Sequence, residues 1–247
     1  MTRRITALLC ALVLLALPGA ARAQQLVADL TNHLVAITTG FTGTSVVLFG
    51  ATDGGGDIVV VVRGPERETV VRRKSRIGGI WLNARSVAFA NVPGYYAVLA
   101  SRPVEDIIPA NLRQVHEIGF DDLKLAPAER AKPGDVTAFR AALIEEQQRA
   151  GLYEKQTGQV SFLGDRLFRA SIAFPATVPT GTYLIQVFLV RKGDIVAAQT
   201  TPLIISQTGL EADINDFAQN HALFYGLVAV VMAAMAGWGV TFLLRNA

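Results

Sequence analysis

A mainly β fold is predicted for this chain: an antiparallel β-sandwich with a short helical insert and one C-terminal transmembrane helix. Short apolar or alternating runs broken by turn residues fill residues 26–103 and return at residue 160, with two helical patterns between them. Residues 222–244 carry no charge. A helix of that length covers roughly 34 Å, enough for a bilayer core of about 30 Å. The sequence therefore predicts a β-rich domain attached to a membrane.

The N-terminus has the pattern of a secretory signal peptide over residues 1–23. Arg3 and Arg4 precede an apolar run, and Ala21-Arg22-Ala23 forms a small-residue cleavage site. Cleavage after Ala23 would remove the single cysteine of the chain, so the mature protein would form no disulfide. An uncleaved N-terminal anchor is the alternative.

The distribution of charge predicts the orientation of the protein. The chain has a net charge of +3, but four arginines fall in the signal peptide and the tail, which leaves 19 basic and 20 acidic residues between. A nearly neutral domain gives no support for a nucleic-acid partner. Arg245 follows the span and fits the cytoplasmic side. We expect a single-pass protein of the bacterial inner (cytoplasmic) membrane, with a periplasmic N-terminal domain and a cytoplasmic C-terminus.

The stretch before residue 104 is predicted to form a first sandwich lobe. Its Val-, Ile-, Leu- and aromatic-rich runs suit a pleated, half-buried surface, and Asp53-Gly54-Gly55-Gly56-Asp57 is a hairpin or a loop between two of them. The predicted strands are His33–Thr38, Ser45–Phe49, Ile58–Arg63, Thr69–Arg73, Ser86–Ala90 and Tyr95–Leu99.

A helical insert and a second β-rich lobe follow. Pro109 and Gly119 bracket a short helix, and Asp135 is a good N-cap for a second helix that ends at Gly151. The predicted organisation is a first lobe at 24–104, a helical insert at 105–153, a second lobe at 154–208, a juxtamembrane linker at 209–221, the span at 222–244 and a tail at 245–247.

Two proline-glycine turns, each leading into a strand that begins with tyrosine, predict an immunoglobulin-like sandwich. They are Pro93-Gly94-Tyr95-Tyr96 and Pro179-Thr180-Gly181-Thr182-Tyr183. In immunoglobulin-like sandwiches the hydroxyl of such a tyrosine bonds back to the nearby backbone. The weak repeat leaves two arrangements open: two sandwiches that flank the helical insert, or one sandwich that carries the insert between its strands.

No motif for catalysis or metal binding is found in the sequence. The three histidines have no metal-ligand spacing, and there is no nucleophile elbow, P-loop or dinucleotide fingerprint. Adjacent acidic pairs such as Asp121-Asp122 do not face each other. We therefore predict no catalytic residues, no metal site and no cofactor.

A basic patch is the candidate contact site of the domain. Residues 63–102 hold eight basic and two acidic residues, a local balance of +6. Arg72, Arg73, Lys74 and Arg76 form the densest part. Such a patch could meet an anion, an acidic partner or lipid headgroups. It could equally be an exposed edge strand whose charge prevents pairing with another chain.

The predicted span carries a stripe of small residues every four positions. Ala229, Ala233, Gly237 and Thr241 would share one face of the helix and let another helix approach closely. The alternative is that these residues reflect only the ordinary composition of a membrane helix.

The order of motifs resembles the uncharacterised alphaproteobacterial transmembrane protein family (Alph_Pro_TM). The resemblance covers nearly the whole mature chain, from Gly40-Phe41-Thr42-Gly43 through Gly79-Ile80-Trp81 and Leu167-Phe168-Arg169-Ala170 to the span. It brings no activity and no catalytic residues. Members of the family are often encoded near sulfite-exporter-like permeases, so the resemblance implies an accessory role in handling small sulfur oxyanions.

These observations favour a membrane-anchored periplasmic binding or accessory protein without catalytic activity, which assists a permease-like membrane protein. One alternative is an enzyme whose site is built from scattered polar residues or a borrowed cofactor. A second is an envelope-assembly factor that presents a sandwich edge to its clients.

Overall fold

A computed structural model describes residues 26–128, 133–208, 225–227, 230–235 and 237–238. The strands of its main sheet are β1 (Leu26–Leu30), β2 (Leu34–Ile37), β3 (Gly43–Thr52), β4 (Asp57–Arg63), β7 (Tyr96–Ala100), β9 (Gly158–Leu163), β10 (Leu167–Pro175), β11 (Gly181–Arg191) and β12 (Asp194–Gln207). A smaller sheet contains β5 (Glu66–Ile77), β6 (Ile80–Pro93) and β8 (Ala126–Pro127). The helices are α2 (Val104–Ile107), α3 (Ala110–His116) and α4 (Pro133–Arg149).

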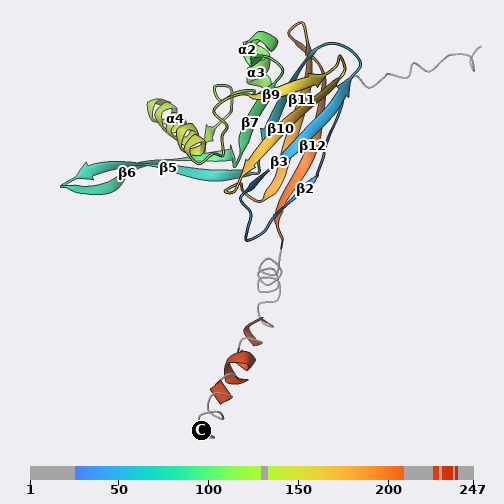
Figure 1. Cartoon of the computed structure of the whole chain (residues 1–247). Coiled ribbons are helices and arrows are strands. Elements are labelled where there is room, and N and C mark those ends of the chain that lie inside the picture. Colours follow the sequence, from blue (N-terminus) through green and yellow to red (C-terminus); the bar gives the residue numbers. More distant parts are fainter. Residues whose placement is uncertain (1–25, 129–132, 209–224, 228–229, 236, 239–247) are drawn as a thin grey trace, which may run out of the picture.

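The nine-stranded sheet curls into two facing layers (Figure 1). Its order is β1-β3-β10-β9-β7-β4-β11-β12-β2, and the parallel pair β7–β9 joins the layers. Strands from before and after the helical insert alternate in this order, as in the pairs β3–β10 and β4–β11. The mainly β prediction is confirmed, and the two stretches expected as separate lobes contribute to one sheet that is sandwich-like.

The first two strands bridge the open side of the curled sheet. β1 pairs with β3 in one layer, whereas β2 pairs in parallel with β12 in the other. Gln199 on β12 adds a side-chain link: its amide nitrogen donates to the carbonyl of Ala28 at 2.7 Å and its oxygen accepts from the Ala28 N–H at 2.9 Å. The edge strand β1 therefore uses backbone groups that would otherwise stay unpaired.

β4 lies in the middle of the fold and is buried on both sides. Ile58, Val60 and Val62 point into the core between the layers, and Val59 and Val61 point into a second core on the outer face. A continuous apolar run is expected for a strand covered on both faces. The half-buried surface predicted for this segment is therefore wrong, because the helical insert covers its outer face.

The two tyrosine turns meet at one end of the first core. The hydroxyl of Tyr183 donates to the carbonyl of Pro179 at 2.6 Å, which is the local bond predicted for it. Tyr95 instead donates to the carbonyl of Ala173, 78 positions away. The ring centroids of Tyr95 and Tyr183 are 6.0 Å apart. The apparent repeat thus builds a single aromatic cluster.

The second core lies between the outer face of β4, β7 and β11 and the helical insert. Tyr96 is fully buried there: its hydroxyl donates to the carbonyl of Glu117 at 2.7 Å and accepts from the N–H of Gly119 at 2.8 Å. The guanidinium of Arg140 on α4 donates to the carbonyl of Phe120 at 2.7 Å in the same loop. These bonds fix the insert to the sandwich.

Several predicted segments lie outside the described residues. They are the signal peptide 1–23, residues 209–221, the tail 245–247 and most of the span, including Ala229 and Thr241. Residues 225–227, 230–235 and 237–238 are helical. Among the described residues, no helix is both long and apolar enough to cross a membrane.

Candidate functional site

The hairpin of β5 and β6 projects from the sandwich and extends beyond α4 (Figure 1). Its base is buried: Val87 and Val92 belong to the second core, and Phe89 pairs with Pro127 of β8. The turn is Gly78-Gly79, whose φ angles of 59° and 86° suit glycine. The predicted strands Thr69–Arg73 and Ser86–Ala90 are parts of this hairpin, so they lie outside the nine-stranded sheet.

Helix α4 supports the hairpin midway along its length. Arg85 on β6 forms an ion pair with Asp135 at 2.9 Å. The guanidinium of Arg73 on β5 lies 5.9 Å from the ring centroid of Phe139, which is buried. A cation over an aromatic face is attracted by the ring quadrupole. Both contacts hold the middle of the hairpin, and the end that carries the Gly78-Gly79 turn continues past them.

The structure divides the predicted basic patch between the two faces of the hairpin. Alternate residues of a strand point to opposite faces, so Arg72, Lys74 and Arg76 share one face and Arg73 faces the other, toward α4. Trp81 is the register partner of Arg76 and lies on the face of the three cations. Only three of the four predicted contact residues are therefore available together.

Nothing in the described part of the chain neutralises these three cations. Arg72, Lys74 and Arg76 are exposed, and none of them forms an ion pair with a described residue. Within the hairpin, Arg76 Nε donates to the carbonyl of Gly79 at 3.2 Å. We call Arg72–Arg76 together with Ile80–Leu82 the hairpin tip.

The apolar part of the hairpin tip was missed in the sequence. Ile80 and Trp81 are each 66% exposed, and Leu82 is 49% exposed. The signal was present, because three large apolar residues follow a Gly-Gly turn beside a run of basic residues. An apolar triplet of this kind is also typical of a buried strand, so the sequence alone does not predict its exposure.

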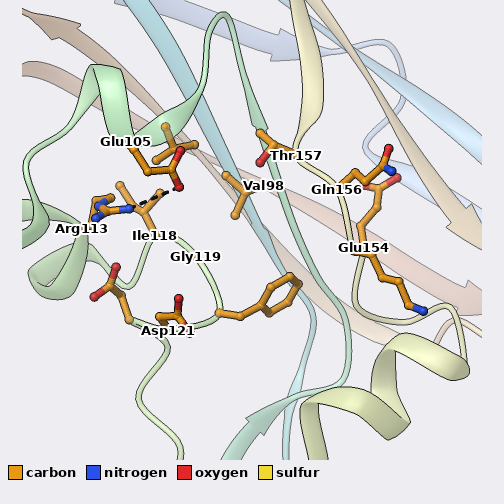
Figure 2. A pocket seen from close by; sticks show the side chains of 13 residues that line it. Val98, Glu105, Arg113, Ile118, Gly119, Asp121, Glu154, Gln156 and Thr157 are labelled. Atoms are coloured by element: carbon orange, nitrogen blue, oxygen red, sulfur yellow. Dashed lines mark hydrogen bonds and ion pairs between the residues drawn. The ribbon is translucent and has the colours of Figure 1, made fainter. Parts of the chain in front are cut away.

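A cavity of about 350 Å³ lies under the helical insert (Figure 2). Val98, Ile118 and Phe120 form its apolar wall, and Arg113 pairs with Glu105 at 3.4 Å across one side. A second cavity of about 290 Å³ adjoins Arg63, Glu117 and Lys124. The full polar lining of the first cavity is Glu105, Arg113, Asp121, Asp122, Glu154, Lys155, Gln156 and Thr157.

Arg63 has a structural role beside the second cavity. It donates to the carbonyls of His116 at 2.6 Å and Glu117 at 3.3 Å, and its other nitrogen lies 3.5 Å from the Glu117 carboxylate. Glu117 ends α3 in the left-handed region, with φ at 53°. Arg63 therefore satisfies carbonyls that the end of the helix leaves unpaired.

The aspartates of the Asp53–Asp57 loop are paired with arginines. Asp57 accepts from Arg102 Nε at 2.9 Å and from the hydroxyl of Ser101 at 3.0 Å, and Asp53 pairs with Arg191. The hydrogen bond from Arg102 lowers the pKa of Asp57 below its ordinary value. The described residues contain no group of three or more His, Cys, Asp and Glu side chains suited to a metal ion.

Glu154, at the rim of the first cavity, is expected to make stability depend on pH. Burial raises the pKa of Glu154 above its ordinary value. The folded state then holds a proton that the unfolded state releases, so this carboxyl lowers the stability as pH rises from about 4.3 through its folded pKa. Glu154→Gln should therefore raise the melting temperature at pH 7 and leave it nearly unchanged at pH 3.5.

Thermal unfolding at both pH values checks this expectation. Glu68→Gln is the matched control, because it removes an exposed carboxylate that forms no ion pair with a described residue. Equal effects of the two substitutions at pH 7 would contradict the role assigned to burial.

Comparison with known proteins identifies one family. A family model described as "Putative transmembrane protein (Alph_Pro_TM)" matches residues 25–246. No curated protein and no solved structure gave a significant match to the chain.

Proposed function

Because the chain belongs to the Alph_Pro_TM family of transmembrane proteins, we propose that it is a membrane-anchored periplasmic accessory protein without catalytic activity of its own. The signal-peptide pattern of residues 1–23 and the uncharged stretch 222–244 support one export step and one span. The sandwich then lies in the periplasm, and the C-terminus in the cytoplasm.

An immunoglobulin-like arrangement of the sandwich is part of this proposal. The first strand is split, with β1 beside β3 and β2 beside β12. Tyr183 bonds back across the turn that opens β11. Immunoglobulin-like domains combine antiparallel layers with such a tyrosine corner. Domains of this architecture have many unrelated functions, so the fold alone assigns none.

The observation that carries the proposed function is the projecting hairpin. It is supported midway along its length by α4 and presents three cations and three large apolar side chains to its surroundings. Exposed apolar groups of this size on a projecting element mark a surface that contacts something else. We propose that the hairpin holds the sandwich in a defined position at the membrane, beside a membrane-protein partner such as a permease for small sulfur oxyanions.

The small-residue stripe of the span is the proposed contact with that partner. Ala233→Leu combined with Gly237→Leu should lower the recovery of the partner about tenfold, because bulky residues keep two helices from close approach. The measurement is quantitative mass spectrometry of the full chain purified from native membranes in mild detergent. Val231→Leu with Met235→Leu is the control, since these positions lie on the other side of a helix and stay apolar.

Recovery of the unsubstituted protein alone would contradict an accessory role. A metal ion or organic cofactor that copurifies in stoichiometric amount would instead favour the enzyme alternative.

A further inference from the structure

We propose that the hairpin tip binds the headgroup region of an anionic phospholipid bilayer, with Trp81 inserted at the interface. This inference rests on the proposed membrane anchoring and names the membrane component that the hairpin contacts. It assigns a lipid-binding site to residues for which the family description gives no role.

The charged face of the tip fits an extended anionic surface. Arg72, Lys74 and Arg76 occupy alternate positions of β5, so their Cα atoms are spaced about 6.6 Å apart along one face of the strand. No described carboxylate pairs with them. Three cations spread along a two-stranded ribbon do not converge on one small oxyanion, whereas each can meet a separate lipid phosphate.

Trp81 lies where contact with a lipid interface requires an apolar group. Trp81 shares the face of the cations, whereas its chain neighbours Ile80 and Leu82 point to the opposite face. The chain has two tryptophans: Trp238 falls in the predicted span, and Trp81 is at the tip. An indole ring is amphipathic and favours the membrane interface. Trp81 beside three cations therefore combines the apolar and electrostatic attraction of a peripheral membrane element.

The length of the hairpin and of the tether allows this contact. Twelve residues of β5 extend over about 40 Å. Figure 1 shows the far end of the hairpin free of the sandwich and of α4. Fourteen residues lie between Gln207 and Ala222, and a chain of that length can reach at most about 50 Å. A sandwich attached by the predicted span can thus place the tip on the same bilayer.

Neither described cavity competes for these side chains. The residues that line the first cavity lie between Val98 and Thr157, and those that line the second lie between Arg63 and Ala126; none of them belongs to the tip. A bilayer interface needs an open surface, while a small ligand needs a concave site.

The test uses the full chain with Trp238→Phe, which leaves Trp81 as the only fluorophore of its kind. The protein is placed in nanodiscs of phosphatidylcholine alone or mixed with phosphatidylglycerol, and quenching by brominated lipid reports contact of Trp81. We expect a blue shift and quenching in anionic nanodiscs, both reduced at high salt. Arg72→Ser, Lys74→Ser and Arg76→Ser together should lower the equilibrium constant for contact about 100-fold, at roughly fivefold per cation.

A matched variant removes the same charge from the sandwich. It combines Arg166→Ser, Arg169→Ser and Lys192→Asn, the last because φ is 54° at Lys192 and asparagine tolerates that region. It should leave the quenching unchanged. Circular dichroism checks that both triple variants fold, and the substituted tip residues are all exposed.

Two results would overturn the inference. One is Trp81 emission that is the same in neutral and anionic nanodiscs. The other is Trp81 emission that does not respond to lipid and shifts only when a copurified protein is present. That result would make the tip a protein-docking element. If either result is found while a membrane partner is still recovered, lipid binding by the tip is wrong and the proposed accessory function stands. If the partner is not recovered but Trp81 still responds to anionic lipid, the accessory function is wrong and lipid binding stands.

Discussion

Replacing Phe139 by alanine is expected to lower the free energy of unfolding by about 3–5 kcal/mol, the usual cost of removing a buried phenylalanine. Phe139 is 4% exposed and belongs to the second core, where it lies on the side of α4 that faces the hairpin. Its removal leaves a cavity and also takes away the ring beneath the Arg73 guanidinium. The position of α4 against the hairpin depends on this side chain.

Denaturant-induced unfolding of the full chain in detergent measures the change. Phe49→Ala is the matched control, because Phe49 is 48% exposed on β3 and its truncation should cost less than about 1 kcal/mol. Similar losses for the two variants would mean that α4 does not contribute to the second core as described. A secondary effect is also expected: Phe139→Ala should weaken lipid contact of Trp81, since the hairpin loses part of its support.

Gly50→Ala is expected to destabilise the protein by about 3 kcal/mol or more, at the upper end of the overpacking range. A Cβ atom at residue 50 would lie 2.5 Å from the carbonyl oxygen of Val27 and 2.4 Å from the Phe168 ring. The ring could shift, but the carbonyl belongs to β1, which is paired with β3 at this point. The substitution therefore pushes the edge strand away from the sheet.

Gly40→Ala provides the comparison in the same measurement. A Cβ atom at residue 40 would have no neighbour within 4 Å. Its effect should lie between zero and a small gain, because alanine restricts the unfolded chain. A near-neutral Gly50→Ala would show that β1 can separate from β3 without loss, and would contradict the close approach seen here.

Much of the secondary structure could be predicted from local patterns. The strands beginning near Ser45, Ile58, Leu167 and Thr182 and the helices that end near Gly119 and Gly151 follow from alternation, helical spacing and turn residues. β1 was missed, although Leu26, Ala28 and Leu30 alternate, because five residues are a short signal beside the expected signal-peptide boundary.

The composition of the sequence predicts where the basic patch lies, and the strand register decides which of its residues share a face. The basic run from Arg72 to Arg76 was recognised, but which of its members act together depends on the face that each residue occupies. Arg73 turns toward Phe139, 66 positions away in the chain, and Trp81 joins the remaining cations across the hairpin. Such contacts depend on pairing and packing that a linear pattern does not contain.

The sequence by itself determined the β-rich class, the helical insert, the uncharged stretch and the density of charge in the patch, because each depends on residues that are neighbours along the chain. Only the tertiary structure decided that both β-rich stretches share one sheet, that β4 is buried on both sides, and that the patch lies on a projecting hairpin. These features arise from contacts between distant segments, where burial of apolar faces and strand register select one arrangement among several with the same local patterns.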